Sequence, residues 1–214
     1  TFKALLAAIY LERGISEASK WFVKQLPTKI IDRLKTFGDR NWCTSGDSQV
    51  NSNNLPSEVG VDYSQLHELL RQGKWEEADL ETKEVMLKVA GLIKGMPPLN
   101  YLPLGSIHQF PCTDLETIDL LWVKCSNGRF GFSVQQRLLL DVEKDWDKFG
   151  DLVGWRVNGI WQSKNDRIFH LGAPVGHLPS AAVRAAGKGK VRMSIYSRIE
   201  NCRVGEKRSL DWAR

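Results

Sequence analysis

The chain has 214 residues, of which 42% are hydrophobic and 26% are charged, and its formal net charge at pH 7 is +5. This composition is ordinary for a soluble globular protein with room for a sizeable core. The longest apolar run, residues 4–11, is too short to cross a bilayer, and no signal peptide is visible. Because the chain opens on Thr1 rather than Met, we interpret it as a piece of a longer polypeptide.

Two compositional features narrow the class of partner and the compartment. Residues 184–208 contain eight Lys or Arg against two Glu, and eight minus two gives +6, more than the excess of the whole chain. Such a stretch predicts nucleic acid, an acidic lipid surface or a carboxylate-bearing ligand as partner, with a solvated basic tail as the alternative. The four cysteines show no C-x-x-C pairing, so we expect free thiols in a reducing compartment rather than zinc or disulfides.

The spacing of apolar residues predicts a mainly α-helical protein in two parts. Residues 2–13, 17–26 and 29–37 have helical periodicity and form an N-terminal helical segment over 1–42. Residues 43–60 are rich in Ser, Asn, Gly and Pro, which is typical of a linker. We therefore expect one larger domain over 61–205, followed by a tail over 206–214.

The larger domain is expected to open with a helical hairpin. Leu66, Leu69 and Leu70 share one helical face that ends at Gly73, and Trp75 starts a second amphipathic helix. An irregular apolar stretch over 99–111 follows. The next helix carries the apolar residues that we assign to the core, namely Leu115, Ile118, Leu121 and Trp122.

A glycine-containing turn follows that core helix and interrupts the helical pattern. Residues 126–128, Ser-Asn-Gly, break the helix, Phe130 and Phe132 flank Gly131, and helical spacing resumes from Ser133. Flat apolar side chains beside a turn with a nearby arginine suit a broad, flat, anionic ligand. The run contains no nucleophile and no metal cluster, so it indicates binding rather than catalysis.

Four motifs, in order and with consistent spacing, carry a family resemblance over about residues 61–203. The runs DYSQLHELLRQGKWEEADLET, DLETIDLLWVKCSNGRFGFSVQ, FGDLVGWR and APVGHLP resemble the Genomes Uncoupled Four family. That resemblance implies a soluble, mostly helical domain that binds protoporphyrin IX or magnesium protoporphyrin IX. It also implies a non-catalytic regulator of magnesium chelatase in chlorophyll biosynthesis, with the chelatase large subunit as partner.

The same resemblance implies a chloroplast stroma or thylakoid surface, or a cyanobacterial cytoplasm, as the location. The resemblance implies that the chain holds no intrinsic metal and catalyses no reaction, so we expect no catalytic residue. Association with a membrane surface is a further expectation, whereas nucleic acid is not an expected partner. A departure from the family pattern is Cys125, where an aromatic residue is common, and this concerns ligand preference rather than the fold.

The N-terminal run TFKALLAAIYLERGISEASKWFVKQL, residues 1–26, weakly resembles the end of a ribonuclease III domain. In that family a Glu of the Phe-Glu-Ala-Leu motif binds the catalytic magnesium ions, and Lys3 occupies that position here. A protonated lysine has no lone pair and repels the metal, so we predict that this segment is inactive. The alternative function is an RNA-binding or degenerate ribonuclease-like protein with a porphyrin-sensing module.

A porphyrin cleft needs apolar walls and one or two cations for the propionates. Arg129 or Arg198 is the predicted propionate partner. His177 is either an axial ligand to a porphyrin metal or a residue that orders its loop by hydrogen bonding. Trp155 is included in the site, although packing in the core is the alternative for so large a side chain. The predicted walls are Phe110, Phe130, Phe132, Val134 and Leu138.

Overall fold

The computed structural model describes residues 43, 55–91, 100–185 and 190–202. The chain divides into two compact units, residues 1–40 and 41–214, and all of the described residues belong to the second. The helices predicted over 2–37, the ribonuclease-like run and the tail lie outside the described residues. The inactivity of the ribonuclease-like segment and the alternative of an RNA-binding protein therefore stay predictions.

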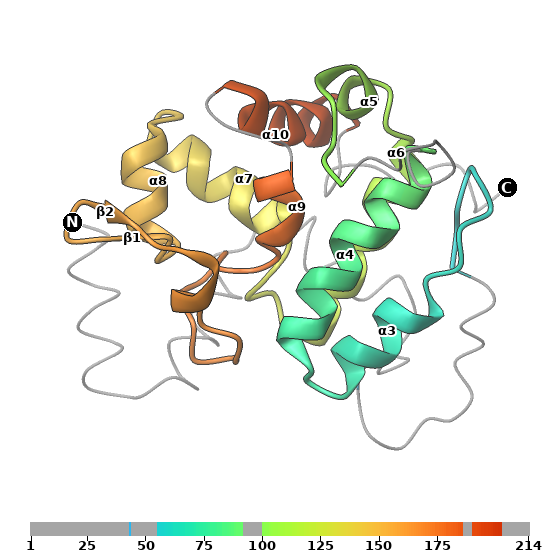
Figure 1. Cartoon of the computed structure of the whole chain (residues 1–214), viewed down its shortest axis with the longest axis horizontal. Coiled ribbons are helices and arrows are strands. Elements are labelled where there is room, and N and C mark those ends of the chain that lie inside the picture. Colours follow the sequence, from blue (N-terminus) through green and yellow to red (C-terminus); the bar gives the residue numbers. More distant parts are fainter. Residues whose placement is uncertain (1–42, 44–54, 92–99, 186–189, 203–214) are drawn as a thin grey trace, which may run out of the picture. The chain divides into compact units, whose positions relative to one another are not determined.

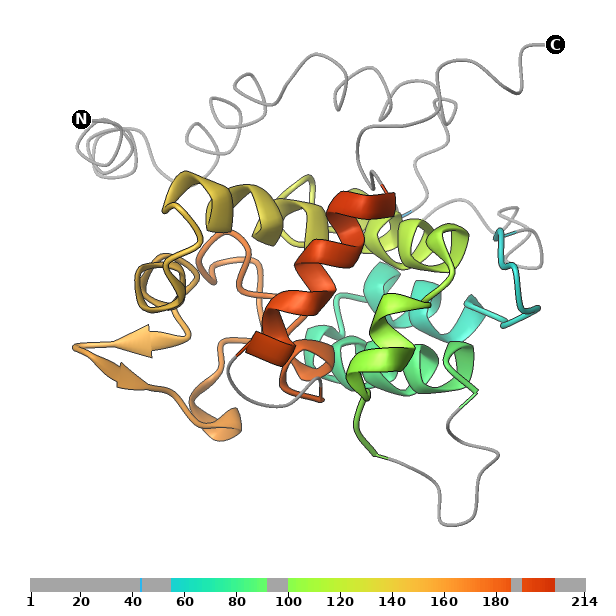
Figure 2. The same cartoon turned by 90° about the horizontal axis from the view of Figure 1, so that it is seen from above.

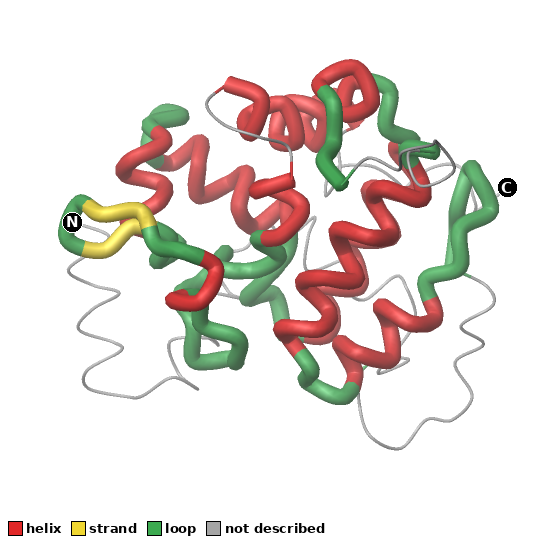
Figure 3. Tube along the Cα trace, viewed as in Figure 1, coloured by secondary structure: helices red, strands yellow, loops and turns green. Residues whose placement is uncertain are grey.

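The described part is mainly helical, which confirms the predicted fold class (Figures 1 and 3). One two-stranded antiparallel hairpin, in which Arg156 pairs with Trp161, interrupts the helices. The helices are α3 (Ser64–Arg71), α4 (Trp75–Val89), α5 (Leu104–His108), α6 (Cys112–Cys125), α7 (Phe132–Asp141), α8 (Trp146–Leu152), α9 (Ala181–Ala185) and α10 (Lys190–Cys202). The strands are β1 (Arg156–Val157) and β2 (Ile160–Trp161), and a 3-10 turn, η2 (Lys164–Asp166), follows them.

The predicted hairpin of helices is present as α3 and α4. Gly73 has a φ of +68° in the turn between them, a conformation that glycine adopts without a steric penalty. The Asp62 carboxylate accepts a hydrogen bond from the Ser64 N–H (2.8 Å), which satisfies one free amide at the start of α3. Along α4 the residues spaced for one face are buried, from Trp75 to Val89. Local periodicity was therefore sufficient to predict this unit.

Helix α6 is the central element of the core. Leu115, Ile118, Leu121 and Trp122 are all buried, as their spacing predicts. The Trp122 indole N–H donates to the Thr82 hydroxyl at 2.9 Å, so the tryptophan joins α6 to α4 without leaving a buried donor unpaired. The core residues of α6 form one hydrophobic cluster with those of the other described helices.

The remaining helices pack around this core in two groups. Helix α4 packs against α3 and α9, while α10 packs against α5, α6 and α7. Figure 2 looks onto α10, with α7 on one side of it and α5 on the other. Helix α8 contacts α7 and the first strand of the hairpin. None of the helices in the described ranges is long and apolar enough to span a membrane.

Two segments differ from the sequence-based expectation. The stretch expected to be irregular contains α5, which is too short for its periodicity to be recognised. It begins after Pro103, whose φ of −62° already suits a helix. Residues 55–60, expected to belong to a linker, contact α6: the Asp114 carboxylate accepts hydrogen bonds from the Ser57 hydroxyl and the Glu58 N–H. These six residues are therefore part of the folded domain.

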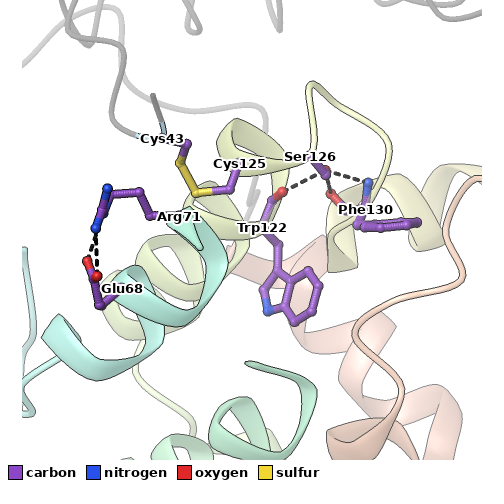
Figure 4. The surroundings of a disulfide bond; sticks show 7 residues. All are labelled: Cys43, Glu68, Arg71, Trp122, Cys125, Ser126 and Phe130. Atoms are coloured by element: carbon purple, nitrogen blue, oxygen red, sulfur yellow. Dashed lines mark hydrogen bonds and ion pairs between the residues drawn. A yellow bond between two sulfur atoms is a disulfide. The ribbon is translucent and has the colours of Figure 1, made fainter. Parts of the chain in front are cut away.

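The cysteines also correct the prediction, because none of the four is a free thiol. Cys43 is bonded to Cys125, and Cys112 is bonded to Cys202. Figure 4 shows the first bond, at the end of α6 and close to the turn that begins at Ser126. The two cysteines of each pair are 82 and 90 residues apart in the chain, so no local spacing motif predicts the bonds.

Candidate functional site

Two of the sequence motifs meet through their backbones. The turn that follows α6 docks on the turn that precedes α9: the Gly131 N–H donates to the Leu178 carbonyl (3.0 Å), and the Gly176 N–H donates to the Arg129 carbonyl (2.9 Å). The Arg129 guanidinium donates through Nε (2.9 Å) and Nη2 (2.6 Å) to the Ala173 carbonyl. Arg129 therefore holds two loops together.

Four of the five predicted apolar walls are buried and belong to the core. Phe130 packs edge-on against Trp75, with ring centroids 5.6 Å apart. Gly131 has a φ of +135°, and a Cβ there would lie 2.7 Å from Val123, so glycine is required by helix packing. The exposed fractions are at most 4% for Phe110, Phe130, Phe132, Val134 and Trp155. Their spacing around a glycine reflects the core, and they expose almost no surface to a ligand.

The other predicted residues are also engaged within the fold. Arg198 of α10 donates from Nε to the Phe110 carbonyl at 2.8 Å, which fixes α10 beside the end of α5. Leu138 is half-buried and packs on Gly176, where a Cβ would lie 2.7 Å from it. Both arginines predicted to meet a propionate donate hydrogen bonds to backbone carbonyls of the fold.

His177 orders its loop and is not placed to bind a metal. It is fully buried, and its Nδ1 lies 2.6 Å from the Val153 carbonyl, to which it donates as the neutral imidazole. Its Nε2 accepts the Ile168 N–H at 3.0 Å. Because both ring nitrogens are used, ligation of a porphyrin metal requires loss of the bond that holds residue 168. The loop-ordering alternative agrees with this geometry.

Burial lowers the pKa of His177 to about 4, and the hydrogen bond to Val153 only partly opposes this. The folded pKa is below the value of about 6.5 in the unfolded chain, so its contribution to stability is complete above pH 6.5 and is lost as the pH falls through 4. We expect the unfolding free energy of the wild type to fall relative to that of His177→Gln over this window, with a slope below about 1.4 kcal/mol per pH unit. Urea unfolding at pH 4, 5, 6 and 7 measures the difference, and parallel curves would contradict it.

A different surface has the character of a ligand-binding face. Of the nine large hydrophobic residues that are exposed in the described ranges, four lie within 15 consecutive residues of one segment. They are Val157 (49% exposed), Ile160 (69%), Ile168 (37%) and Leu171 (43%). The segment contains β1, β2 and η2, and Figure 2 shows its hairpin pointing away from the helices. We call residues 156–172 the hairpin segment.

Aromatic stacking holds the hairpin segment on α8. The Trp161 ring stacks on that of Trp146, with centroids 5.7 Å apart and an interplanar angle of 18°. It also lies across Gly150, where a Cβ would be only 2.5 Å from the indole. At the other end, His177 holds the backbone at Ile168. The apolar residues are therefore presented on an anchored support, which lowers the ordering cost of binding.

The contact at Gly150 gives a direct test of this anchoring. We expect Gly150→Ala to push Trp161 off α8, which removes the near-ultraviolet circular dichroism of the stacked Trp146–Trp161 pair. Gly105→Ala is the matched control, because Gly105 is also helical and a Cβ there meets nothing within 4 Å. The control is expected to keep the spectrum and to gain up to about 1 kcal/mol of helix stability. An unchanged spectrum in Gly150→Ala would contradict the model of anchoring.

Cationic side chains lie beside these apolar residues. The Arg156 guanidinium donates to Asp151 (3.0 and 3.1 Å) and lies 3.6 Å from Asp147. The Arg167 guanidinium is 4.8 Å above the Trp155 ring, in cation–π geometry. The segment thus combines an apolar face with arginines that can meet carboxylates bidentately.

The hairpin segment is not predicted from the sequence as a site, because its apolar residues have no regular period. One signal was available: Asn158-Gly159 between Val157 and Ile160, a dipeptide that favours a tight hairpin turn. Both residues have positive φ, +50° and +81°. That signal predicts the hairpin but not the exposure of its side chains, which depends on what α8 covers.

Two other features of the described part bear on a binding site, a metal centre and a hollow. No three His, Cys, Asp or Glu side chains gather to hold a metal within the described ranges. A hollow between α7 and α10, lined by Leu140, Met193 and Tyr196 among others, encloses about 240 Å³ even with open solvent included. Pockets for drug-sized ligands enclose about 300–1,000 Å³, so this hollow is too small for a macrocycle.

Comparisons with known proteins agree with the sequence motifs. Residues 56–194 match the model of the GUN4-like family. A Ycf53-like protein of Synechocystis sp. is 38% identical over 126 residues, which are 58% of this chain and 53% of that protein. A chloroplastic tetrapyrrole-binding protein of Arabidopsis thaliana is 31% identical over 132 residues, which are 57% of this chain and 49% of that protein. The chain spans about half the length of the curated relatives it matches.

Solved structures show the same fold. A structure of GUN4 from Chlamydomonas reinhardtii superposes with a TM-score of 0.58 at 28% identity and covers 72% of this chain and 93% of its own. The ligand-free structure of Arabidopsis thaliana GUN4 gives 0.54 at 27% identity and covers 64% and 95%. Since the family model matches well over half of the residues, this chain belongs to the GUN4-like family.

Proposed function

We propose that this chain is a non-catalytic tetrapyrrole-binding protein and that the hairpin segment receives one face of the macrocycle. The observation that carries the proposal is the group of four exposed apolar side chains on an anchored segment, in a chain of the GUN4-like family. A relative in Arabidopsis thaliana is named for tetrapyrrole binding, which supports the same ligand class.

The physical demands of a porphyrin fit this segment. Covering about 400 Å² of macrocycle at about 25 cal/mol per Å² gives roughly 10 kcal/mol, of which association costs remove several, so micromolar binding is expected. The two propionates need cations at the rim of the apolar face. Arg156, Arg167 and Lys164 lie in the segment for that role. Protoporphyrin IX and magnesium protoporphyrin IX are both compatible with this arrangement.

The residues first predicted for the site have a supporting role in this proposal. Arg129 and His177 hold the turns against which the segment is anchored, and Trp155 lies beneath Arg167. Phe110, Phe130, Phe132 and Val134 are buried in the core, Leu138 is half-buried, and Arg198 fixes α10. Truncating them is therefore expected to act on folding before it acts on ligand contacts.

Titration of the full chain with deuteroporphyrin tests the binding proposal. We expect saturable quenching of tryptophan fluorescence, because Trp146, Trp155 and Trp161 lie in or under the hairpin segment. The non-linearity caused by porphyrin absorbance is measured with free tryptophan as the control. Absence of saturation with the folded chain would contradict the proposal.

We further propose that the bound form stimulates magnesium chelatase through its large subunit, in a plastid or a cyanobacterial cell, with association to a membrane surface. Relatives from Synechocystis, the red alga Porphyra purpurea and Arabidopsis thaliana support this setting. Adding the chain to a reconstituted chelatase is expected to raise the rate of magnesium insertion, while the chain alone inserts none. An unchanged rate with a chain that still binds porphyrin would contradict regulation but not binding.

A further inference from the structure

Each of the two disulfides joins an end of α6 to a cysteine outside the residues that match the family model. Cys112 and Cys125 are the first and last residues of α6, the central helix of the core. Their partners, Cys43 and Cys202, lie outside residues 56–194, which match the family model. One bond thus joins the last residue of α6 to residue 43, before the family match, and the other joins the first residue of α6 to the last residue of α10, just beyond the match.

The cysteines of both bonds keep part of their surface exposed, and none of the four is buried. Attack by an external thiolate requires access to one sulfur of the bond, and buried disulfides deny it. Disulfides that exist in a thiol-buffered compartment are commonly redox-responsive rather than permanent. Cyanobacterial and plastid relatives are the setting in which such a compartment is expected.

We propose that Cys43–Cys125 and Cys112–Cys202 are redox-responsive staples that hold residue 43 and the last turn of α10 at the two ends of α6, and that a dithiol reductant of the thioredoxin class opens them. This inference concerns the thiols and does not depend on the ligand. For each bond, a thiolate of the reductant attacks one sulfur and forms a mixed disulfide, and the partner cysteine leaves as a thiolate. The second thiol of the reductant resolves the mixed disulfide. Two electrons and two protons are transferred, the protein gains two thiols, and the reductant becomes a disulfide.

Opening the staples changes defined parts of the domain. With Cys43–Cys125 closed, residue 43 is covalently held at the end of α6, beside the turn in which Ser126 binds Phe130 (Figure 4). With Cys112–Cys202 closed, the last turn of α10 is held at the first turn of α6. After its reduction, α10 is still held by the Arg198–Phe110 hydrogen bond and by its packing against α5, α6 and α7, while its last turn loses the covalent link to α6. The reduced chain is expected to keep its core, because no cysteine is among the buried residues of the hydrophobic cluster, although Cys125 and Cys202 pack against it.

The test uses the full chain, equilibrated in glutathione buffers from oxidising to reducing and separately with thioredoxin, its reductase and NADPH. Alkylation followed by peptide mapping is expected to find two bonds with these pairings under oxidising conditions and four thiols after thioredoxin treatment. Reduction is expected to lower Tm by about 5–15 °C and to speed hydrogen exchange in the first turn of α6 and the last turn of α10.

Two variants keep the test specific. Cys43→Ser removes one staple and is expected to leave only the Cys112–Cys202 part of the shift in Tm. A chain with all four cysteines replaced by serine is expected to fold, to have the Tm of the reduced chain and not to respond to thioredoxin. Four thiols under every oxidising condition, or two bonds that resist thioredoxin in the native chain, would each overturn the proposal.

Discussion

Replacing Asp79 with alanine is expected to lower the free energy of unfolding by about 3–5 kcal/mol. Asp79 is fully buried on α4, and its carboxylate accepts hydrogen bonds from the Ser180 N–H, from the Ser180 hydroxyl (2.9 Å) and from the Ala181 N–H (2.9 Å). The Arg184 guanidinium lies 3.6 Å from its Oδ2. Alanine leaves all of these donors without their acceptor at the start of α9.

Burial raises the pKa of Asp79, while its hydrogen bonds and Arg184 oppose that rise. The carboxylate is thus a costly group that the structure retains because it joins α9 to α4. Asp79→Asn keeps an oxygen for the two backbone N–H groups, so it is expected to lose less stability than the alanine variant. Urea unfolding followed by circular dichroism measures both losses.

Glu77→Ala is the matched control for this prediction. Glu77 lies two residues earlier on the same helix and is exposed. Its removal is expected to change the unfolding free energy by less than about 0.5 kcal/mol. A loss below about 1 kcal/mol in Asp79→Ala would show that the buried carboxylate does not hold α9.

Changing Ile160 to aspartate is expected to weaken porphyrin binding at least about 10-fold without unfolding the chain. Ile160 is 69% exposed, so the folded protein gains little from its side chain. Burying an isoleucine side chain against a ligand contributes up to about 1.5–3 kcal/mol, and the new carboxylate also repels the propionates. Both effects lower affinity.

Val59→Asp controls for the introduction of a charge at an exposed apolar position. Val59 is 51% exposed and belongs to the segment that docks on Asp114, far along the chain from the hairpin segment. Its change is expected to leave the Kd within about twofold. Fluorescence titration of the wild type, Ile160→Asp and Val59→Asp with porphyrin measures the three Kd values. Equal Kd values for the wild type and Ile160→Asp would exclude the hairpin segment as the ligand face.

Measuring stability and affinity together distinguishes residues that contact the ligand from residues that only support the fold. Truncation of Phe132, which is fully buried, is expected to reduce stability by about 3–5 kcal/mol, so any loss of binding there follows from unfolding. A variant at Ile160 has no such ambiguity. The earlier expectation that Phe130 and Phe132 form the walls of a cleft is therefore tested by measuring stability and affinity together.

The sequence by itself determined the helices whose apolar residues repeat at helical spacing, notably α3, α4, α6 and α7. That pattern is local, because residues three and four apart share a face whatever the rest of the chain does. It also determined the family, since four motifs in order carry information that no single one has. The core assignment of Leu115, Ile118, Leu121 and Trp122 followed from the same local rule.

Only the tertiary structure decided which conspicuous residues are buried and which are exposed. Phe130 lies inside because it packs against Trp75 of α4, and His177 lies inside because it is bonded between Val153 and Ile168. Ile160 lies outside because Trp161, its neighbour in the hairpin, is the residue that packs on α8. The cysteines pair because the fold brings together residues 82 and 90 positions apart. These outcomes depend on contacts between distant segments, and a local pattern carries no information about such contacts.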